Sequence, residues 1–344
     1  MPIGSPAPIW AGAGSDAADR DGAQGMIDRR RFLARGFSGG LALPLIGAAT
    51  GVYAIGVEPN FILRVKRYSL TPPGWPAGLR LRFAVISDIH AGEPFMGAAR
   101  IRRIAETANA LNPDAVLLLG DFNAGHFFVT RAVEPQQIGE AFSVLRAPLG
   151  CFAILGNHDW WHGPLLTSPS DGTVAIRRAL RQAGIAVLEN DAVALAKDGQ
   201  KFWIVGLADQ LIDAMAQIDA NAQKLGGDDL DGALAQVSDD APAILLAHEP
   251  FIFPAVPDRV ALTLCGHTHG GQVNLPLLGP VVGDLRFGPA YVYGHVAQGG
   301  RHMIISGGLG ESIAPVRLLR PPEIVEIELG APVDETARLA GFWS

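Results

Sequence analysis

Apolar runs and helically spaced segments alternate along the chain from residue 81 to residue 155. The nearly continuous apolar runs are typical of strands that are buried on both faces. The segments between them carry apolar side chains at helical spacing, and Pro113 ends the first of these. In order, the sequence predicts strand 81–86, helix 98–111, strand 114–119, a helix through Ile138, Phe142 and Leu145, and strand 151–155. This alternation predicts parallel strands that are joined by right-handed crossovers.

The pattern changes after residue 170. Asp198-Gly199 separates two short strand-like runs and predicts a hairpin. The polar stretch 209–240 is rich in Ala and Asp and predicts one or two surface helices. The other predicted elements are a helix at 173–183 and strands at 185–188, 192–197, 201–205, 243–247, 260–264, 303–306 and 324–328. Parallel units followed by hairpins predict an α/β (α+β) fold: a four-layer αββα sandwich of two mixed β-sheets flanked by helices.

Five short polar motifs follow apolar runs, each close to the point where a predicted strand ends. They are Asp88-Ile89-His90, Gly120-Asp121, Gly156-Asn157-His158-Asp159, His248-Glu249 and Gly266-His267-Thr268-His269. Open α/β sheets gather functional groups at the carboxyl ends of their strands, so we expect these motifs to meet at one edge. The flanking glycines allow the tight turns that such an edge requires. Imidazole nitrogens combined with carboxylate and amide oxygens suit two divalent transition metals that share a bridging carboxylate.

The amino-acid composition excludes some classes of protein. The 344 residues are 49% hydrophobic and 18% charged, which is ample for a full core. The net charge of −7 excludes a nucleic-acid binder that relies on a generally basic surface. Two cysteines do not make a disulfide framework, and we expect Cys151 and Cys265 to be buried free thiols.

The N-terminal region is typical of an export signal. Residues 1–25 are mostly Ala, Gly, Pro and Ser, which predicts a disordered extension. The segment 28–34, Asp-Arg-Arg-Arg-Phe-Leu-Ala, resembles a twin-arginine signal with Arg29 and Arg30 as the pair. Residues 36–57 carry no charge and predict a weakly hydrophobic signal or a retained membrane anchor. An ordinary signal-anchor helix and a buried helix of the domain are the alternatives.

These features divide the chain into five parts. They are a disordered extension (1–25), a twin-arginine signal or membrane anchor (26–57), a linker and lead-in (58–79), a catalytic domain (80–330) and a C-terminal tail (331–344). Met26 is an alternative start to Met1, because it lies two residues before Asp28. The signal predicts that the twin-arginine translocase carries the folded, metal-loaded protein to the periplasm or leaves it anchored to the cytoplasmic membrane.

Over about residues 80–328 the motif set resembles the calcineurin-like metallophosphoesterase family. The strings SDIHAG (87–92), GNHDWW (156–161), AHEP (247–250) and GHTHGGQ (266–272) are similar to its YkuE- and YaeI-type branch of exported or membrane-associated phosphodiesterases, as are GGLG (307–310) and PEI (322–324). The resemblance implies a first metal bound by Asp88, His90 and His269, a second bound by Asn157, His248 and His267, and Asp121 as the bridge. We expect two divalent ions, with manganese preferred to iron or zinc. The same ligands accept all three metals.

The resemblance leaves His158 outside the ligand set and implies that it donates a hydrogen bond or proton to the phosphoryl or leaving oxygen. We expect Asp159 to orient the His158 ring and keep it protonated. His126 and His162 are candidate contacts at the substrate mouth, although a solvated loop position is the stronger expectation for each.

Other residues are assigned lesser roles. Trp160 and Trp161 either pack within a loop or form a platform for an apolar leaving group. We expect a surface ion pair for Arg317 rather than a phosphate or ligand contact, and structural roles for His295 and His302. Asn123 stands where relatives often carry an acid, and we expect it to tune the surroundings of the metals without affecting the Asp121 bridge.

The sequence therefore predicts a phosphodiesterase or phosphomonoesterase in which a water that bridges two metals attacks phosphorus while His158 assists. The alternative is a hydrolase like UDP-2,3-diacylglucosamine pyrophosphatase of lipid A synthesis, which needs an acyl-chain groove and a cytosolic location. A non-catalytic, metal-stabilised interaction module is disfavoured, because every ligand position and His158 are present. The substrate is a phosphate ester, and its identity depends on loops such as 122–135, 160–172 and 272–290.

Overall fold

The computed structural model describes residues 44–126, 128–160, 171–212, 227–281 and 288–330. The chain forms two compact units, Met1–Thr50 and Gly51–Ser344. Of the first unit only residues 44–50 are described, and they are helical. The predicted extension 1–25, the arginine pair and the tail 331–344 lie outside the described residues. Within the described residues, no helix is both long and apolar enough to cross a bilayer.

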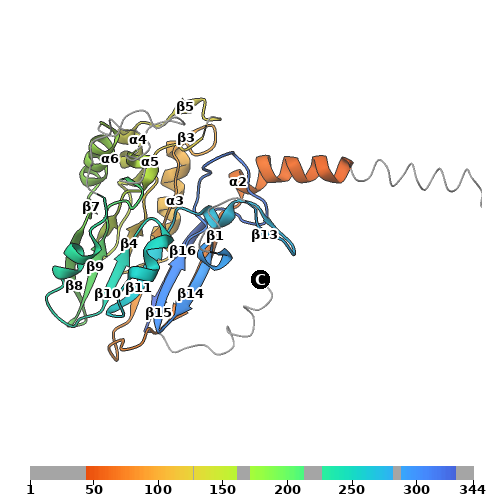
Figure 1. The fold of residues 1–344 in the computed structure, drawn as a ribbon. Helices are drawn as coiled ribbons and strands as arrows, with labels where there is room; N and C mark the ends of the chain where they lie inside the picture. The colour runs from red at the N-terminus through yellow and green to blue at the C-terminus, as the bar shows by residue number, and fades with distance from the viewer. Residues whose placement is uncertain (1–43, 127, 161–170, 213–226, 282–287, 331–344) are drawn as a thin grey trace, which may run out of the picture. The chain divides into compact units, whose positions relative to one another are not determined.

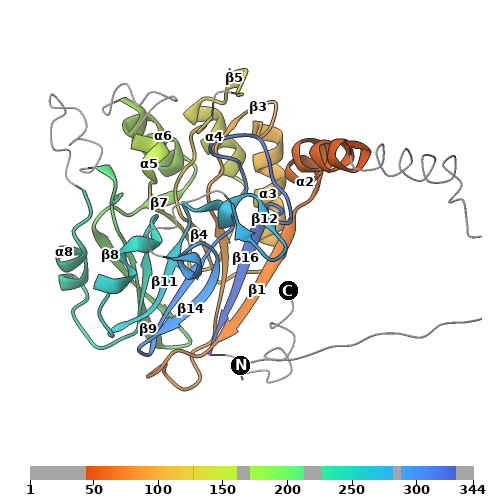
Figure 2. The same ribbon diagram turned by 45° about the vertical axis from the view of Figure 1, so that its right-hand side comes forward.

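The second unit contains two six-stranded mixed sheets (Figures 1 and 2). The first has the order β1 (Arg64–Leu70), β16 (Glu323–Leu329), β2 (Leu81–Ile86), β4 (Ala115–Leu118), β6 (Cys151–Ala153) and β7 (Ile185–Val187). The second has the order β14 (Gly294–Gln298), β15 (Arg301–Ile305), β11 (Val260–Cys265), β10 (Ala243–Leu246), β9 (Gln200–Gly206) and β8 (Asp191–Lys197). Strands β2, β4, β6 and β7 run parallel, as do β9, β10, β11 and β15. The predicted hairpin is the antiparallel pair β8–β9.

Helices and short ribbons complete the unit. The helices are α2 (Glu58–Phe61), α3 (Ala98–Ala110), α4 (Pro135–Phe142), α5 (Asn157–Trp160), α6 (Asp171–Gln182) and α8 (Leu230–Ala235), with the π-helical turn η1 (Tyr53–Val57) and the 3₁₀ turns η2 (Pro250–Ala255), η3 (His269–Gly271) and η4 (Pro289–Tyr291). Two small ribbons pair β3 (Gly92–Glu93) with β5 (Arg131–Ala132), and β12 (Asn274–Leu275) with β13 (Gly279–Pro280). Of the predicted surface helices in 209–240, α8 is described, and residues 213–226 lie outside the described residues.

The core lies in three apolar layers, because successive side chains of a strand point to opposite faces. In β2, Phe83 and Val85 join the cluster between the two sheets, whereas Ala84 and Ile86 face α3, α4 and α6. The outer face of the second sheet packs against α8 and η2, with Phe253 at the centre of that contact. The predicted four-layer αββα sandwich is therefore confirmed, and the continuous apolar runs reflect strands that are covered on both sides.

One boundary prediction is wrong. Part of the supposed linker and lead-in, 58–79, is the strand β1, which pairs in parallel with β16 from Arg64 opposite Glu323 to Leu70 opposite Leu329. This strand lies at the edge of its sheet and is only partly covered, so its sequence RVKRYSL carries charges where a central strand carries apolar residues. The polar composition that predicted a linker reflects an edge position instead.

Candidate metal centre

The five polar motifs follow β2, β4, β6, β10 and β11, at the carboxyl end of each strand. The first three strands belong to one sheet and the last two belong to the other, so the two sheets contribute to one site across the layer between them. Parallel neighbours place these ends at the same edge, as the sequence predicts. The arrangement of the strands in the two sheets therefore brings together motifs that lie far apart in the sequence.

The backbone is strained at the motifs. Asp88, His90, Asp121, His267 and His269 all have positive φ, between 47° and 68°, a region that few residues other than glycine adopt. Conformations of this kind persist where the surrounding structure enforces them, and they cluster at functional sites. Here the tight turns direct the side chains toward one another.

Two glycines provide the space that these side chains need. A Cβ on Gly156 would overlap the Asp121 carboxylate and the His248 ring, and a Cβ on Gly266 would overlap Ser87 and Asp88. The prediction that the motif glycines allow other groups to approach the backbone closely is confirmed at both positions.

One group of ligand atoms lies around Asp88, His90, Asp121 and His269, within 4.8 Å of one another. His90 Nε2 is 3.4 Å from Asp121 Oδ2, and His269 Nε2 is 3.6 Å from Asp88 Oδ1. The Nε2 atoms of His90 and His269 are only 3.0 Å apart. The resemblance assigns these residues to the first metal and to the bridge.

The hydrogen bonds of the His90 and His269 imidazoles determine which ring nitrogen is available to bind a metal ion. His90 Nδ1 lies 3.0 Å from the carbonyl oxygen of Asn123, and His269 Nδ1 lies 3.1 Å from that of Gly310. A carbonyl only accepts, so each Nδ1 carries the proton and each neutral ring presents a lone pair at Nε2. Two lone pairs that face each other at 3.0 Å repel unless a cation lies between them. Backbone carbonyls thus fix the tautomer that metal binding requires.

A second group contains His248, Glu249 and His267. His248 donates from Nδ1 to the carbonyl of Leu119 at 2.6 Å and directs Nε2 to Asp121 Oδ2 at 3.2 Å. His267 Nδ1 lies 3.1 Å from the amide oxygen of Asn157. Asp121 Oδ2 therefore faces both groups, as a bridging carboxylate must.

The electrostatics favour the charged form of Asp121 and the neutral form of three of the four ligand imidazoles, those of His90, His267 and His269. Burial lowers the pKa of His90 to about 3 and raises that of Asp88 to about 6. Burial also acts on Asp121, but the neighbouring His248 and His158 outweigh it and hold the pKa of Asp121 well below its usual range. The Asp121 carboxylate likewise outweighs burial at His248 and raises its pKa, so a proton and a cation compete for the same Nε2.

The donor set fits two divalent cations. Asp88, His90 and His269 would hold the first, Asn157, His248 and His267 would hold the second, and Asp121 would contact both. All of the seven predicted ligand positions are brought together by the fold. Sequence reasoning missed Glu249, although it stands next to His248 in the fourth motif.

Asp159 has a different role from the one predicted. Its carboxylate accepts hydrogen bonds from four backbone N–H groups, those of Asp121, Phe122, Asn123 and Gly156, at 2.8–3.1 Å. Burial, and then the charge of Asp121, raise its pKa to about 7. Asp159 thus fixes the loop that carries the bridging aspartate, and its oxygens are occupied by backbone rather than by the His158 ring.

His158 is the second residue of the short helix α5, beside the metal centre. Its backbone N–H donates to Asp121 Oδ1 at 2.8 Å, and its ring packs edge-on against His90 with centroids 4.9 Å apart. Its Nε2 lies 3.5 Å from the Ser312 hydroxyl. The ring is thus held next to the first group of ligands without taking part in it.

The two candidate substrate histidines differ in what the structure describes. His162 and Trp161 lie outside the described residues. His126 is buried against Phe95 and Phe128, so the expectation of a solvated loop position is wrong for this residue. Burial, and then His158, lower the pKa of His126.

Arg317 is fully buried, and the predicted surface ion pair is wrong. Its guanidinium donates to the carbonyls of Gly307 and Gly310, lies 3.4 Å from His269 Nδ1, and is 3.6 Å from Glu311. Arg317 therefore positions the loop whose Gly310 carbonyl fixes the tautomer of His269.

The remaining predictions concern residues away from the ligands. Cys151 and Cys265 are free and buried, as predicted. His295 and His302 stack on each other at 5.1 Å between ring centroids, on β14 and β15. Trp160 is buried, with the Arg177 guanidinium 5.8 Å from its ring.

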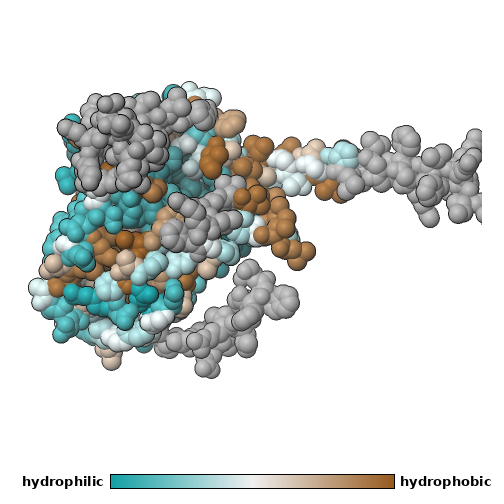
Figure 3. All heavy atoms as spheres, viewed as in Figure 1, coloured by the Kyte–Doolittle hydropathy of each residue, from teal (hydrophilic) through white to brown (hydrophobic). Residues whose placement is uncertain are grey.

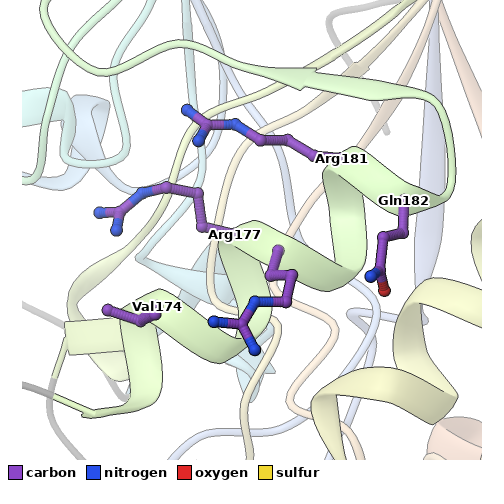
Figure 4. Close-up of a pocket in the computed structure, with 5 residues that line it drawn as sticks. Val174, Arg177, Arg181 and Gln182 are labelled. Atoms are coloured by element: carbon purple, nitrogen blue, oxygen red, sulfur yellow. The ribbon is translucent and has the colours of Figure 1, made fainter.

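A basic groove lies on the surface of α6, outside the metal centre. Val174, Arg177, Arg178, Arg181 and Gln182 line it, and Arg177 and Arg181 project to the same side of the helix (Figure 4). Arg177 is already paired with Glu189 at 2.6 Å. The groove contributes no residue to the metal ligands.

Comparison with known proteins agrees with the geometry. The model of the calcineurin-like phosphoesterase family matches residues 81–271. The metallophosphoesterase YkuE of Bacillus subtilis (strain 168) is 32% identical over 311 residues, which cover 88% of this chain and 98% of the relative. Phosphodiesterase YaeI of Escherichia coli (strain K12) is 29% identical over 306 residues, covering 88% of this chain and 100% of the relative.

A third relative is named for a different reaction. UDP-2,3-diacylglucosamine pyrophosphatase LpxG of Chlamydia trachomatis serovar D is 28% identical over 279 residues, which cover 69% of this chain and 77% of the relative. Each of the three relatives is matched over most of its own length. The family match, the relatives and the buried ligand cluster together show that the chain belongs to the calcineurin-like phosphoesterase family.

Proposed function

We propose that the protein is an exported phosphodiesterase that uses two divalent cations, preferably Mn²⁺. The observation that carries the metal part of the proposal is the pair of opposed Nε2 lone pairs on His90 and His269, 3.0 Å apart, beside the carboxylates of Asp88 and Asp121. Bound there, the cations would activate water as a nucleophile and polarise the phosphoryl group. The relative YaeI, named as a phosphodiesterase, supports the reaction type.

His158 is the residue that we propose acts on the substrate directly. His158 is partly exposed, unlike His90 and His269, and its Nε2 lies 3.5 Å from the Ser312 hydroxyl, where we place the phosphoryl or leaving oxygen. A positioned imidazole typically contributes 10²- to 10⁴-fold by proton transfer or hydrogen bonding. The role of Asp159 in this step is indirect, because its carboxylate holds the Asp121 loop.

The second candidate function is hydrolysis of a pyrophosphate bond in a nucleotide-sugar lipid. The relative LpxG favours it, and both reactions use the same nucleophile and the same attack on phosphorus. The two functions differ in the leaving group, and therefore in the residues that surround the cations rather than in the ligands themselves.

A substrate panel separates the candidates. The purified full-length protein, loaded in turn with Mn²⁺, Fe²⁺ and Zn²⁺, is assayed on bis(p-nitrophenyl) phosphate, p-nitrophenyl phosphate, a phospholipid and UDP-2,3-diacylglucosamine. We expect the diester to be cleaved fastest with Mn²⁺. A preference of tenfold or more for the nucleotide-sugar lipid would establish the second function instead, and no hydrolysis with any metal would contradict both.

We further propose export by the twin-arginine translocase and association with the outer side of the cytoplasmic membrane. Exposed apolar side chains support the association, among them Phe61 (82% exposed), Leu277 (106%) and Leu278 (78%). In Figure 3 hydrophobic residues gather around the segment from η1 to α2. Its residue Ala54 accepts a hydrogen bond from the Arg317 backbone, and Leu318 in turn accepts one from Asn274 beside the Leu277 loop.

Exchange of the arginine pair tests the localisation. Replacing Arg29 and Arg30 together by lysine should leave the precursor in the cytoplasm, whereas the same exchange at Arg102 and Arg103, in α3, should not affect export. Fractionation followed by immunoblotting measures the outcome. Unchanged export of the Arg29→Lys, Arg30→Lys protein would contradict the twin-arginine route.

A further inference from the structure

Glu249 is a buried carboxylate whose environment lacks the usual compensation. Its side chain is fully buried, and Pro250 begins the turn η2 directly after it. One oxygen, Oε2, accepts a hydrogen bond of 3.3 Å from the backbone of Gln210. The other, Oε1, has no hydrogen-bond partner among the described residues. A buried anionic oxygen without a partner is costly, so it requires a positive group nearby.

The unpaired oxygen is directed at the second group of ligands. Oε1 lies 3.8 Å from His267 Nδ1, and the ligand atoms of His248, Glu249 and His267 all lie within 4.8 Å of one another. His248 Nε2 is also buried, with Asp121 Oδ2 3.2 Å away. The amide oxygen of Asn157 approaches the same place, 3.1 Å from His267 Nδ1. Four donor atoms therefore converge on one point.

A hydrogen bond between Glu249 and His267 does not explain this arrangement. At 3.8 Å the pair is too far apart for a hydrogen bond, and His267 Nδ1 lies closer to Asn157. Asp209, a second fully buried carboxyl group, stands beside Glu249 and accepts a hydrogen bond at Oδ1 from the backbone of Leu211. Burial, and then the charge of Glu249, raise the pKa of Asp209 well above its usual range, so the negative charge of this pair lies on Glu249. The geometry therefore leaves the Glu249 carboxylate among the ligand atoms of His248 and His267.

We propose that Glu249 supplies an additional oxygen ligand to the second divalent cation, an inference that rests on the proposed two-metal function. The other ligands of that position are neutral apart from the shared Asp121. A second carboxylate raises the affinity for a hard divalent ion such as Mn²⁺ and makes the two positions unequal. Glu249 thus distinguishes this chain's second position from one made only of an amide and two imidazoles.

Calorimetric titration with Mn²⁺ alone tests the ligand role. The full-length protein is stripped with a chelator and titrated, and bound metal is counted by mass spectrometry. We expect the wild type to bind two ions, and Glu249→Gln to weaken one binding event by about 100-fold while the other changes less than threefold. Glu326→Gln is the matched control, because Glu326, on β16, is also buried but pairs with Arg67 of β1. Both binding events should be unchanged in it.

Thermal unfolding of the same proteins separates a ligand from a structural residue. Without metal, Glu249→Gln should unfold at the same temperature as the wild type or higher, since it removes an uncompensated buried charge. The rise in unfolding temperature on adding Mn²⁺ should shrink. A purely structural Glu249 predicts the reverse, with a lower unfolding temperature of the metal-free variant and two intact binding events, and that result would overturn the inference.

The two proposals fail in different ways. A wild type that binds two Mn²⁺ ions together with a Glu249→Gln variant that binds them equally well would overturn only the role of Glu249. A wild type that binds no Mn²⁺ would overturn the two-metal function and this inference together.

Discussion

The two halves of the metal centre have similar ligands, but the charged side chains next to those ligands have opposite signs. Behind His269 of the first half lies the buried guanidinium of Arg317, 3.4 Å from Nδ1. Behind His267 of the second half lies the carboxylate of Glu249, with Asp209 next to it. A cation in the first position is therefore close to the Arg317 guanidinium, which faces Glu311 on its other side, and a cation in the second position is close to the Glu249 carboxylate.

The imidazoles respond to this difference. Burial, then His90 and then Arg317, lower the pKa of His269 well below its usual range. Burial also lowers the pKa of His267, but there Glu249 acts in the opposite direction. The less basic ring is the weaker ligand, so the surroundings and not the ligand types make the two positions unequal. The identity of the ligands alone therefore does not determine how each position binds its ion.

The largest loss of metal binding and activity should come from replacing Asp121, the carboxylate that faces both halves of the metal centre. Asp121→Asn keeps an oxygen for the His158 backbone N–H but removes the charge that faces His90 and His248. We expect both metal ions to be lost and phosphodiester hydrolysis to fall on the order of 1,000-fold. Metal content and kcat/KM measure the two effects.

The loss of both ions is the informative outcome for Asp121→Asn. If one ion remained at full occupancy, the two halves would be independent and Asp121 would not bridge them. Retention of full activity would contradict the two-metal mechanism itself.

A smaller effect should come from His158, which belongs to neither half. Its ring packs against His90 without joining the ligand atoms. His158→Ala should keep both metal ions and lower kcat about 100-fold, since the missing group acts on the substrate. His302→Ala, on β15 away from the centre, is the control that should change neither quantity. Loss of a metal ion from His158→Ala would make His158 part of the first half.

The sequence predicts the parts of this molecule that depend on local patterns. Strands buried on both faces carry continuous apolar runs, so β2, β4, β10 and β11 were recognisable, and the ligand motifs follow them directly. The family resemblance then assigns each ligand to a metal, and the fold brings all seven together. The edge strand β1 was missed because its partial exposure allows charged residues.

The charges behind the ligands could not be predicted from local patterns. Arg317 donates to the carbonyls of Gly307 and Gly310 in an irregular loop, and no periodic pattern marks such contacts. Glu249 meets Asp209 from 40 positions away, and in a single sequence an Asp and a Glu in separate loops give no sign of proximity. The only local signal was the position of Glu249 next to His248, where its side chain could have pointed either way.

The smallest effect concerns the order in which the two positions fill. A unit charge a few Å from a bound ion changes its binding by one or more kcal/mol at an effective dielectric constant of about 20, and about 1.4 kcal/mol is tenfold in Kd. We therefore expect Mn²⁺ to bind the wild type in two steps whose Kd values differ about tenfold, the tighter one beside Glu249. His267→Ala and His90→Ala identify the steps by calorimetry, because each removes one imidazole from one half. The tight step should disappear in His267→Ala and persist in His90→Ala. The opposite result would mean that Arg317 does not weaken the first position, and that the ligands themselves outweigh the charges behind them.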